Sequence, residues 1–348
     1  MITVAMITEV KSYTEIFSFQ NPGGMGTIVP LWARELEKLG CRVAIDDPKV
    51  DWDILHLHSP LPASIYLAIR AKLRGKTIVT HGHHLPELIR GGFKGGTLFY
   101  PIFKRYSRYF YNLGDVVIVP SPYAEKVLRA MGVKRPMEIV FNGIDRDRFK
   151  KDPEAGTEFR RKWNLGDDDF IILSVGLRIP RKGVDTFLET AAEFNRRHPS
   201  SNVKFVWVGG SEPLLVDAMP GGALPDNVLF TGFVSFEQLL AAYSAADLFL
   251  FPTRAESYGN VIVEAASCNL PLVIREIPVF DEWLVDGSDC IKCRDAMEFV
   301  SAVELLWEDR EMRARLSFAS GRLAKSHDIE HTARRLFDIY SQLIGDIG

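Results

Sequence analysis

The feature that most constrains this chain is a regular alternation of short apolar segments with amphipathic ones along its whole length. Unbroken apolar strands are typical of parallel sheets that helices cover on both faces. The alternation therefore predicts an α/β fold built from doubly wound, Rossmann-like sheets. The expected strands are Ile2–Ile7, Val43–Ile45, Ile54–Leu57, Thr77–Val79, Val116–Val119, Ile139–Phe141, Phe170–Val175, Val203–Val208, Val228–Phe230, Leu248–Phe251 and Leu272–Ile274.

The alternation restarts after residues 150–169, a charged segment that proline and glycine interrupt. A chain of 348 residues is about twice the usual domain size. We therefore expect domains at 1–150 and 151–328, with a ligand at the carboxyl ends of both sheets. Residues 329–348 are expected to form a C-terminal helix, a candidate to pack back toward the N-terminal domain.

Composition excludes several classes of protein. No stretch approaches the ~18 uninterrupted apolar residues of a membrane-spanning helix, and the N-terminal MITVAMIT segment is typical of a first strand. Four cysteines are too few for a disulfide framework, which fits a cytoplasmic location. Cys290 and Cys293 have metal or redox spacing but lack the surrounding pattern of either kind of site.

Charge is distributed unevenly between the two halves. Residues 1–150 hold 21 Lys and Arg against 14 Asp and Glu, whereas the remainder holds 21 against 31. Within residues 93–111, eight aromatic residues are interleaved with four cations, Lys94, Lys104, Arg105 and Arg108. A basic, aromatic helix is suited to an anionic membrane surface, although half of these aromatics could instead be domain core. No nucleic-acid recognition module accompanies the charge, so we expect no nucleic-acid partner.

The sharpest chemical pattern is Glu256-Ser-Tyr-Gly-Asn-Val-Ile-Val-Glu264, after the expected strand Leu248–Phe251. Gly259, Asn260 and Val261 open the next helix, whose unpaired N–H groups form an anion site. Glu256 lies in the loop and Glu264 on the helix, so the two carboxylates would reach different hydroxyls of one elongated ligand. Taken alone, the spacing also fits glutamates that stabilise a helix N-terminus.

A cationic turn, Gly176-Leu-Arg-Ile-Pro-Arg-Lys-Gly183, directly follows another expected strand. Three cations between a strand and a helix are suited to a diphosphate, because charge-assisted hydrogen bonds are about twice as strong as neutral ones. The alternative is a solvated basic turn. Gly23-Gly24-Met25-Gly26, before the first amphipathic helix, is weaker evidence because such a segment can be only a tight turn.

In this order, these segments resemble family 4 of the glycosyltransferases, which has the GT-B fold. The resemblance covers essentially the whole chain and includes Asn142-Gly-Ile-Asp145 and Gly232-Phe-Val234. It implies two Rossmann-like domains facing each other across a cleft. The N-terminal domain would bind the acceptor, and the C-terminal domain the nucleotide sugar.

The resemblance also implies roles for the glycine-rich segment and the cationic turn. Gly24, Gly26, Arg178 and Lys182 would hold the diphosphate of the donor. The family places its arginine directly after the glycine, where this chain has a leucine. Arg178 and Arg181 therefore both stay candidates for the diphosphate.

Further roles follow from the same resemblance. Glu264 would hold the ribose, Glu256 the sugar hydroxyls, and main-chain groups near Phe233 the base. A histidine after the strand Thr77–Val79 would lie beside the primary hydroxyl of the donor sugar, with His83 favoured and His81 second.

The resemblance implies no obligatory metal and no cofactor, because cations and a helix N-terminus offset the leaving diphosphate and the nucleotide sugar is a co-substrate. Asp51-Trp-Asp53 spells the metal-binding pattern of the other glycosyltransferase fold, but it precedes a strand, so we expect no metal there.

Four segments look like those of the bacterial diacylglycerol glucosyltransferases, peripheral membrane enzymes that use UDP-glucose: Thr80–His84, Asp115–Ser121, Val175–Gly183 and Arg275–Leu284. The resemblance therefore implies a retaining transfer of a hexose, glucose from UDP-glucose, to a glycerolipid hydroxyl at the inner face of the cell membrane. The alternatives are a soluble sugar-phosphate or glycan acceptor, or a non-hydrolysing nucleotide-sugar epimerase.

Overall fold

The structure is a computed structural model that describes residues 1–9, 23–90, 92–212, 214–219, 221 and 223–345. It contains two compact units. Unit 1 comprises Met1–Gly143 together with His327–Gly348, and unit 2 comprises Ile144–Ser326. The first break thus falls at Gly143, ahead of the expected boundary at residue 150, and the C-terminal helix is grouped with unit 1.

Unit 1 holds a parallel sheet of six strands in the order β2-β1-β3-β4-β5-β6. Its strands are β1 (Thr3–Ile7), β2 (Arg42–Ile45), β3 (Ile54–Leu57), β4 (Thr77–His81), β5 (Val116–Val119) and β6 (Met137–Ile139). Its helices are α2 (Gly23–Lys38), α3 (Pro62–Leu73), η1 (Pro86–Ile89), α4 (Gly96–Leu113), α5 (Pro122–Met131) and α12 (Ile329–Gly345).

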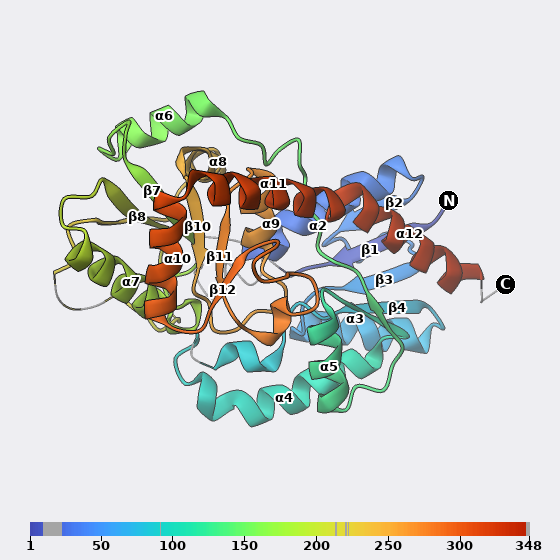
Figure 1. The fold of residues 1–348 in the computed structure, drawn as a ribbon. Coiled ribbons are helices and arrows are strands. Elements are labelled where there is room, and N and C mark those ends of the chain that lie inside the picture. Colours follow the sequence, from blue (N-terminus) through green and yellow to red (C-terminus); the bar gives the residue numbers. More distant parts are fainter. Residues whose placement is uncertain (10–22, 91, 213, 220, 222, 346–348) are drawn as a thin grey trace. The chain divides into compact units, whose positions relative to one another are not determined.

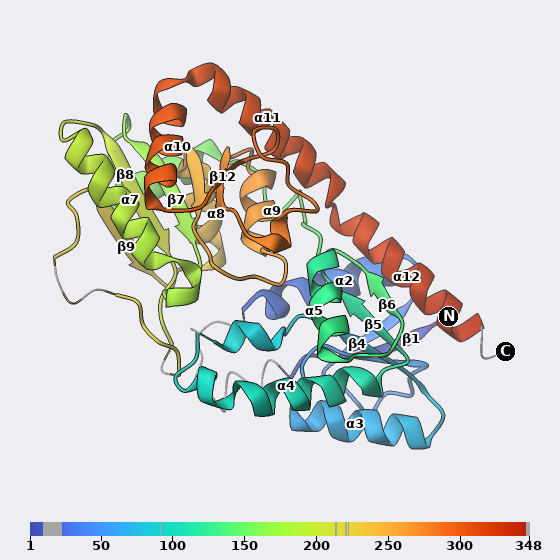
Figure 2. The ribbon, with the colours of Figure 1, turned by 60° about the horizontal axis from the view of Figure 1, so that its bottom comes forward.

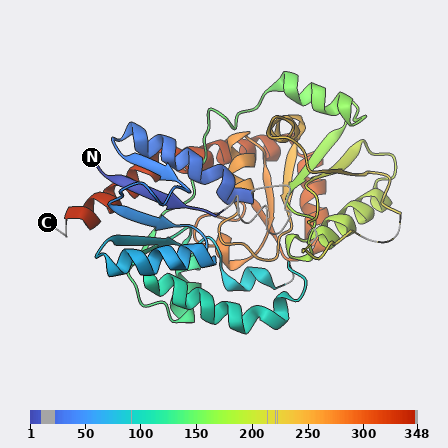
Figure 3. The ribbon, with the colours of Figure 1, turned by 180° about the vertical axis from the view of Figure 1, so that it is seen from behind.

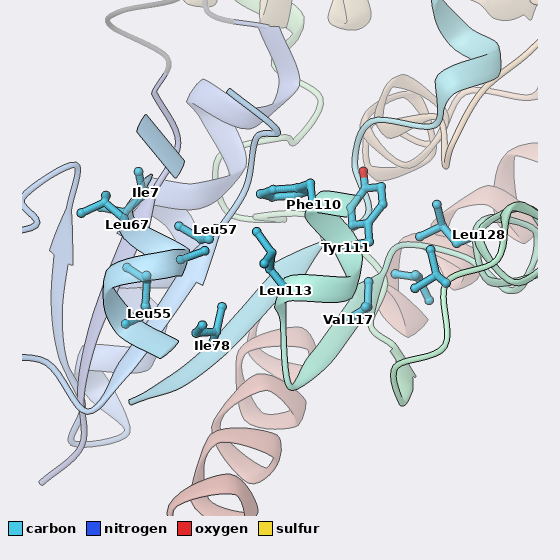
Figure 4. Close-up of a cluster of buried hydrophobic side chains, with 14 of the residues drawn as sticks. Ile7, Leu55, Leu57, Leu67, Ile78, Phe110, Tyr111, Leu113, Val117 and Leu128 are labelled. Carbon is cyan, nitrogen blue, oxygen red and sulfur yellow. The ribbon is translucent and has the colours of Figure 1, made fainter. Parts of the chain in front are cut away.

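Helices cover both faces of this sheet (Figures 1 and 3). On one face α2 and α12 pack through a cluster that contains Trp32, Leu36 and Tyr340. On the other face α3, α4 and α5 pack through a second cluster, in which Phe110 and Tyr111 lie near strand residues (Figure 4). Unit 1 therefore has two buried apolar layers, and its strands are covered as continuous apolar runs require.

Unit 2 repeats the plan with a second parallel sheet, in the order β12-β11-β10-β7-β8-β9. Its strands are β7 (Phe170–Val175), β8 (Val203–Val208), β9 (Val228–Gly232), β10 (Leu248–Phe251), β11 (Leu272–Arg275) and β12 (Ile291–Cys293). Its helices are α6 (Pro153–Lys162), η2 (Pro180–Lys182), α7 (Val184–Arg197), α8 (Phe236–Ala245), α9 (Asn260–Ser267), η3 (Pro278–Phe280), α10 (Ala296–Glu308) and α11 (Arg310–Ser326).

Both faces of the second sheet are also covered. On one face α7 and α10 pack through a cluster that contains Phe187 and Phe299. On the opposite face α8 packs through the ring of Tyr243, whose centroid lies 6.0 Å from that of Phe249. The predicted α/β architecture of two doubly wound sheets is confirmed. His83 follows β4, Arg178 and Lys182 follow β7, and Glu256 and Gly259 follow β10.

Candidate active site

Unit 2 brings Lys182 and Glu256 into direct contact beyond the carboxyl ends of β7 and β10. Lys182 Nζ lies 2.5 Å from Glu256 Oε1, and Arg181 Nη1 lies 3.6 Å from the same oxygen. Thr253 Oγ1 donates to this oxygen at 2.9 Å. One carboxylate thus faces two cations, and the cluster keeps a net positive charge suited to an anionic ligand.

The contact depends on the close approach of the η2 turn to the loop after β10. Gly183 ends the turn with a φ of +77°, and a Cβ there would lie 2.1 Å from the carbonyl oxygen of Pro252. Only glycine satisfies both conditions. The backbone N–H of Arg254 donates to the carbonyl of Arg181 at 2.8 Å. The backbone therefore positions the cations and the carboxylate before any ligand binds.

Burial and charge act in opposite directions within this cluster. Burial lowers the pKa of Lys182, and the attraction of Glu256 opposes that shift. Burial by itself would raise the pKa of Glu256, but the charges of Lys182 and Arg181 outweigh it and hold that pKa below its ordinary value. Glu256 therefore stays ionised, and an incoming phosphate would compete with it for the ammonium group of Lys182.

The structure separates the two arginines that both remained candidates for the diphosphate. Arg178 forms a bidentate pair with Asp217, with Nε 2.8 Å from Oδ1 and Nη2 2.7 Å from Oδ2. This pair raises the pKa of Arg178 further. Arg181, in contrast, lies with Lys182 against Glu256. In this arrangement Arg181, rather than Arg178, belongs to the cationic cluster.

Glu264 lies on α9, which begins after Gly259 with a φ of +98°. The hydroxyl of Tyr243 donates to Glu264 Oε2 at 2.8 Å. Burial raises the pKa of Glu264 to about 7, against the opposing effects of Tyr243 and Lys182. Asn260 and Val261 form the first turn of α9, which contains no acidic side chain. This turn is therefore open to an anion by charge.

The other donor-side candidates are placed less sharply. Phe233 directly follows β9 and is half-buried. Gly24 and Gly26 lie within the first turn of α2, and not in a turn before it as we expected. The correction has a simple cause, because glycine at a helix start costs little where the terminal N–H groups have no helical partner. Residues 10–22, which precede these glycines, lie outside the described residues.

Unit 1 places five histidines at the ends of β3 and β4: His56, His58, His81, His83 and His84. The rings of His81 and His83 stack face to face, with centroids 3.8 Å apart and 2° between their planes. The ring of Trp32 stacks on His81 at 5.0 Å. His81 is fully buried, whereas His83 is partly exposed. Of the two predicted histidines, His83 is therefore the more exposed in this structure.

These imidazoles are neutral. Burial lowers the pKa of His56 to about 3 and that of His84 to about 4, and it lowers the pKa values of the other three well below the ordinary range. In the part of the chain that the structure describes, His56, His58 and His81 each bring a nitrogen within 4.8 Å of the others, a spacing that could hold a metal ion. Cys290 and Cys293 are free and buried, and burial raises the pKa of each thiol to about 12. Thiols with such pKa values are inert.

Known proteins are similar to most of this chain in sequence. The profile of glycosyl transferases group 1 matches residues 156–322, and that of glycosyltransferase family 4 matches residues 45–148. The processive diacylglycerol α-glucosyltransferase of Acholeplasma laidlawii is 28% identical over 342 residues, 97% of this chain and 98% of that protein. The α-galactosylglucosyldiacylglycerol synthase of Streptococcus pneumoniae is 30% identical over 261 residues, 71% of this chain and 68% of that protein. The chain belongs to glycosyltransferase family 4.

The fold of this glycosyltransferase agrees with that assignment. Sucrose-phosphate synthase from Thermosynechococcus elongatus superposes with a TM-score of 0.80 at 18% identity, covering 99% of this chain and 100% of that one. The predictions of a family 4 glycosyltransferase and of the GT-B fold are thus confirmed. Within the described residues, no helix is both long and apolar enough to span a bilayer.

Sequence reasoning missed four side chains of this glycosyltransferase: three contact candidate residues, and Tyr340 contacts His56, which lies 3.2 Å from His81. Thr253 and Tyr243 donate to Glu256 and Glu264. Trp32 stacks on His81, and Tyr340 lies 2.6 Å from His56. Thr253 stands three residues before Glu256, so its position in the sequence could have predicted this contact. The other three come from distant segments and carry no local signal.

Proposed function

We propose that this glycosyltransferase transfers glucose from UDP-glucose to the hydroxyl of a diacylglycerol-type lipid, with retention of the anomeric configuration. The observation that carries the proposal is the similarity over 97% of the chain to an enzyme named as a diacylglycerol α-glucosyltransferase. The second relative is also named as a synthase of a glycosylated diacylglycerol. The side chains of unit 2 support the nucleotide-sugar donor, and those of unit 1 support the lipid acceptor.

The cationic cluster of unit 2 supports binding of a nucleotide-sugar diphosphate. In the proposed complex Lys182 and Arg181 contact the diphosphate, and Glu256 turns from its cations to the sugar hydroxyls. Glu264 accepts from the ribose, and α9 adds its N-terminal N–H groups. Two cations at the departing phosphate stabilise the charge that develops as the bond to the anomeric carbon breaks.

The chemical step that we propose is a front-face substitution. The acceptor oxygen bonds to the anomeric carbon on the face from which the phosphate oxygen departs, and that phosphate oxygen takes the proton of the acceptor hydroxyl. We propose no covalent glycosyl–enzyme intermediate, because Glu256 is assigned to the sugar hydroxyls and not to the anomeric carbon. The step needs neither a metal ion nor a cofactor.

Unit 1 supports a lipid acceptor through the exposed face of α3 and α4, which run side by side (Figure 2). Apolar side chains on this face are open to solvent: Tyr66, Ile69 and Leu73 on α3, and Leu98, Phe99, Ile102 and Tyr109 on α4. Leu98 is 77% exposed and Leu73 is 83% exposed. Exposed apolar groups gathered on one face mark interaction sites.

Cations accompany this apolar face. Lys104, Arg105 and Arg108 line a hollow of about 240 Å³ together with Pro101 and Met131. None of the three cations has an ion pair with a carboxylate among the described residues. Apolar groups next to unpaired cations are suited to an anionic bilayer surface. We therefore propose that this face holds the enzyme at the membrane that contains its acceptor.

The proposal is tested by nucleotide release. The purified protein would be given UDP- and GDP-linked hexoses, with and without vesicles that contain diacylglycerol, and the free nucleotide diphosphate and the lipid product would be measured. We expect UDP-glucose together with diacylglycerol to give release well above the slow hydrolysis seen without acceptor, with an α-linked product. Release that follows a soluble sugar phosphate or glycan would identify a different acceptor, and a β-linked product would contradict retention.

Glu264→Ala is expected to raise the donor KM about tenfold and to change kcat little. A ribose contact is the same in the ground state and the transition state, so its loss weakens binding uniformly. Steady-state kinetics with varied donor would measure both parameters. An unchanged donor KM would mean that Glu264 does not hold the ribose.

The pKa of Glu264 also predicts a pH dependence. The carboxylate form, which accepts from the ribose, predominates above a pH of about 7, and the neutral acid predominates below it. The donor KM should therefore rise as the pH falls through 7. Tyr243→Phe removes a hydrogen bond that lowers this pKa, so the same rise should begin at higher pH. In Glu264→Gln the rise around pH 7 should be absent, and its persistence would assign it to another group.

A further inference from the structure

Three buried side chains of unit 1 form a continuous hydrogen-bonded chain. The hydroxyl of Tyr340, on α12, lies 2.6 Å from His56 Nδ1, on β3. His56 Nε2 lies 3.2 Å from His81 Nδ1, at the end of β4. All three side chains are fully buried. The C-terminal helix thus reaches the histidine cluster, although Tyr340 is 284 residues from His56.

The position of the proton on His56 follows from the hydroxyl of Tyr340. Burial raises the pKa of Tyr340, so its hydroxyl keeps its proton. Within the described part of the chain, His56 is the hydrogen-bond partner that this hydroxyl has, and a buried O–H group donates wherever it can. His56 Nδ1 is therefore an acceptor. Because neutral imidazole carries one proton, that proton lies on Nε2.

The hydrogen bond between His56 and His81 makes the tautomer of His81 depend on that of His56. His56 Nε2–H can only donate, so His81 Nδ1 accepts and the proton of His81 lies on Nε2. His81 Nε2 is buried and has no hydrogen-bond partner among the residues that the structure describes. A buried N–H group without a partner costs about 1–3 kcal/mol. Such a group is consistent with a donor that is completed by a ligand.

We propose that Tyr340 is a positioning residue that, through His56, holds His81 as a neutral ring with its proton on Nε2, so that His81 donates to a hydroxyl oxygen of the transferred sugar. This rests on the proposed function, because it makes His81 a substrate-facing donor of the same reaction. It assigns the C-terminal helix a part in the chemistry of unit 1. It also requires His81, which stacks against His83, to be uncharged.

A metal ion is the competing interpretation of the cluster, because three of its histidines have suitable spacing. The geometry disfavours it. Both nitrogens of His56 already have partners, one in Tyr340 and one in His81. One nitrogen of His81 is also taken, because Nδ1 pairs with His56. A metal ion would therefore have to break the hydrogen bonds that join Tyr340, His56 and His81.

The first test reads the tautomers directly in the full-length protein. Two-bond nitrogen–proton correlation spectra of histidine-labelled protein distinguish Nδ1–H from Nε2–H rings. We expect Nε2–H for both His56 and His81 in the wild type. Tyr340→Phe keeps the ring and removes the hydroxyl, so His56 should become a mixture of tautomers and His81 should follow it. This readout needs no substrate, so it is independent of whether the proposed donor and acceptor are correct.

Tyr111→Phe is the matched control. It also removes a buried hydroxyl from unit 1, but that hydroxyl donates to the backbone carbonyl of His84 at 2.8 Å. We expect its thermal stability to fall as for Tyr340→Phe, with the tautomers of His56 and His81 unchanged. A change of tautomer in both variants would show a general loosening of the unit.

The second test uses kinetics. Tyr340→Phe should lower kcat/KM for transfer about tenfold, the effect of losing one hydrogen bond to substrate, and leave the Kd of UDP unchanged. His81→Gln supplies an amide N–H donor that needs no tautomer, so Tyr340→Phe should have no further effect on kcat/KM in that background.

The proposal is overturned by any of four results. His81 in the wild type could carry its proton on Nδ1. Tyr340→Phe could leave both tautomers unchanged, or lower kcat/KM equally in the His81→Gln background. Stoichiometric binding of Co²⁺ or Zn²⁺ that removes the histidine N–H signals would assign the cluster to a metal instead.

Discussion

Lys182→Ala is expected to lower kcat/KM for the nucleotide-sugar donor by about two orders of magnitude. Its ammonium group lies 2.5 Å from Glu256 Oε1, where we propose that the leaving diphosphate forms. Loss of one preorganised group that stabilises developing charge costs about 3 kcal/mol in the transition state. Steady-state kinetics with varied donor would measure kcat and KM separately. We expect most of it in kcat, because the charge on the phosphate grows as the bond breaks.

The two neighbouring arginines provide the matched controls. Arg181→Ala should also lower kcat/KM strongly, since Arg181 shares the carboxylate of Glu256 with Lys182. Arg178→Ala should have a small effect, because Arg178 is held by Asp217. Thermal unfolding of all three variants would separate a loss of fold from a loss of function. A larger effect from Arg178 than from Arg181 would reverse the assignment, and wild-type kcat/KM in Lys182→Ala would remove Lys182 from the site.

Replacing Lys104, Arg105 and Arg108 together with glutamate is expected to abolish binding to anionic vesicles. Each basic side chain near an anionic surface contributes about 1 kcal/mol, and reversal of its charge turns this attraction into repulsion. Cosedimentation with anionic and neutral liposomes at low and high salt would measure binding. The electrostatic part should fade as salt rises, whereas the part due to Leu98, Phe99 and Ile102 should persist because it comes from buried apolar area.

The control for this variant is an equal change of charge elsewhere. Arg310, Arg315 and Lys325 are exposed on α11 in unit 2, so their replacement by glutamate changes the net charge by the same amount. We expect this variant to keep vesicle binding. Hydrolysis of the donor without acceptor should be similar in both triple variants. Equal vesicle binding by the wild type and the α4 variant would contradict the membrane proposal and favour a soluble acceptor.

The sequence was sufficient to predict most of the architecture. Apolar runs such as Val116–Val119 and Leu248–Phe251 form strands at the expected residues, because a strand buried on both faces is typically an unbroken apolar run. The cationic turn and the Glu256 loop follow β7 and β10. Since β7 and β10 pair in parallel, both segments lie at the same edge of the sheet.

The local sequence pattern gave a wrong prediction for the glycine-rich segment. Gly24 and Gly26 were expected in a turn, and they lie instead in the first turn of α2. Glycine has a high propensity for turns and for helix starts alike, so its presence does not distinguish the two. The choice depends on how the rest of α2 packs, through residues such as Trp32 and Leu36, on the sheet of unit 1.

The sequence by itself determined the α/β class, the two sheets and the segments that carry the candidate chemistry, because hydrophobic periodicity and turn residues act locally. Only the tertiary structure decided which groups pair within those segments. Arg178 pairs with Asp217, whereas Arg181 lies with Lys182 against Glu256. Tyr243 donates to Glu264, and Tyr340 contacts His56. These partners are 21 to 284 residues apart. Their proximity is set by the order of strands and the packing of helices, which no local pattern of residues encodes.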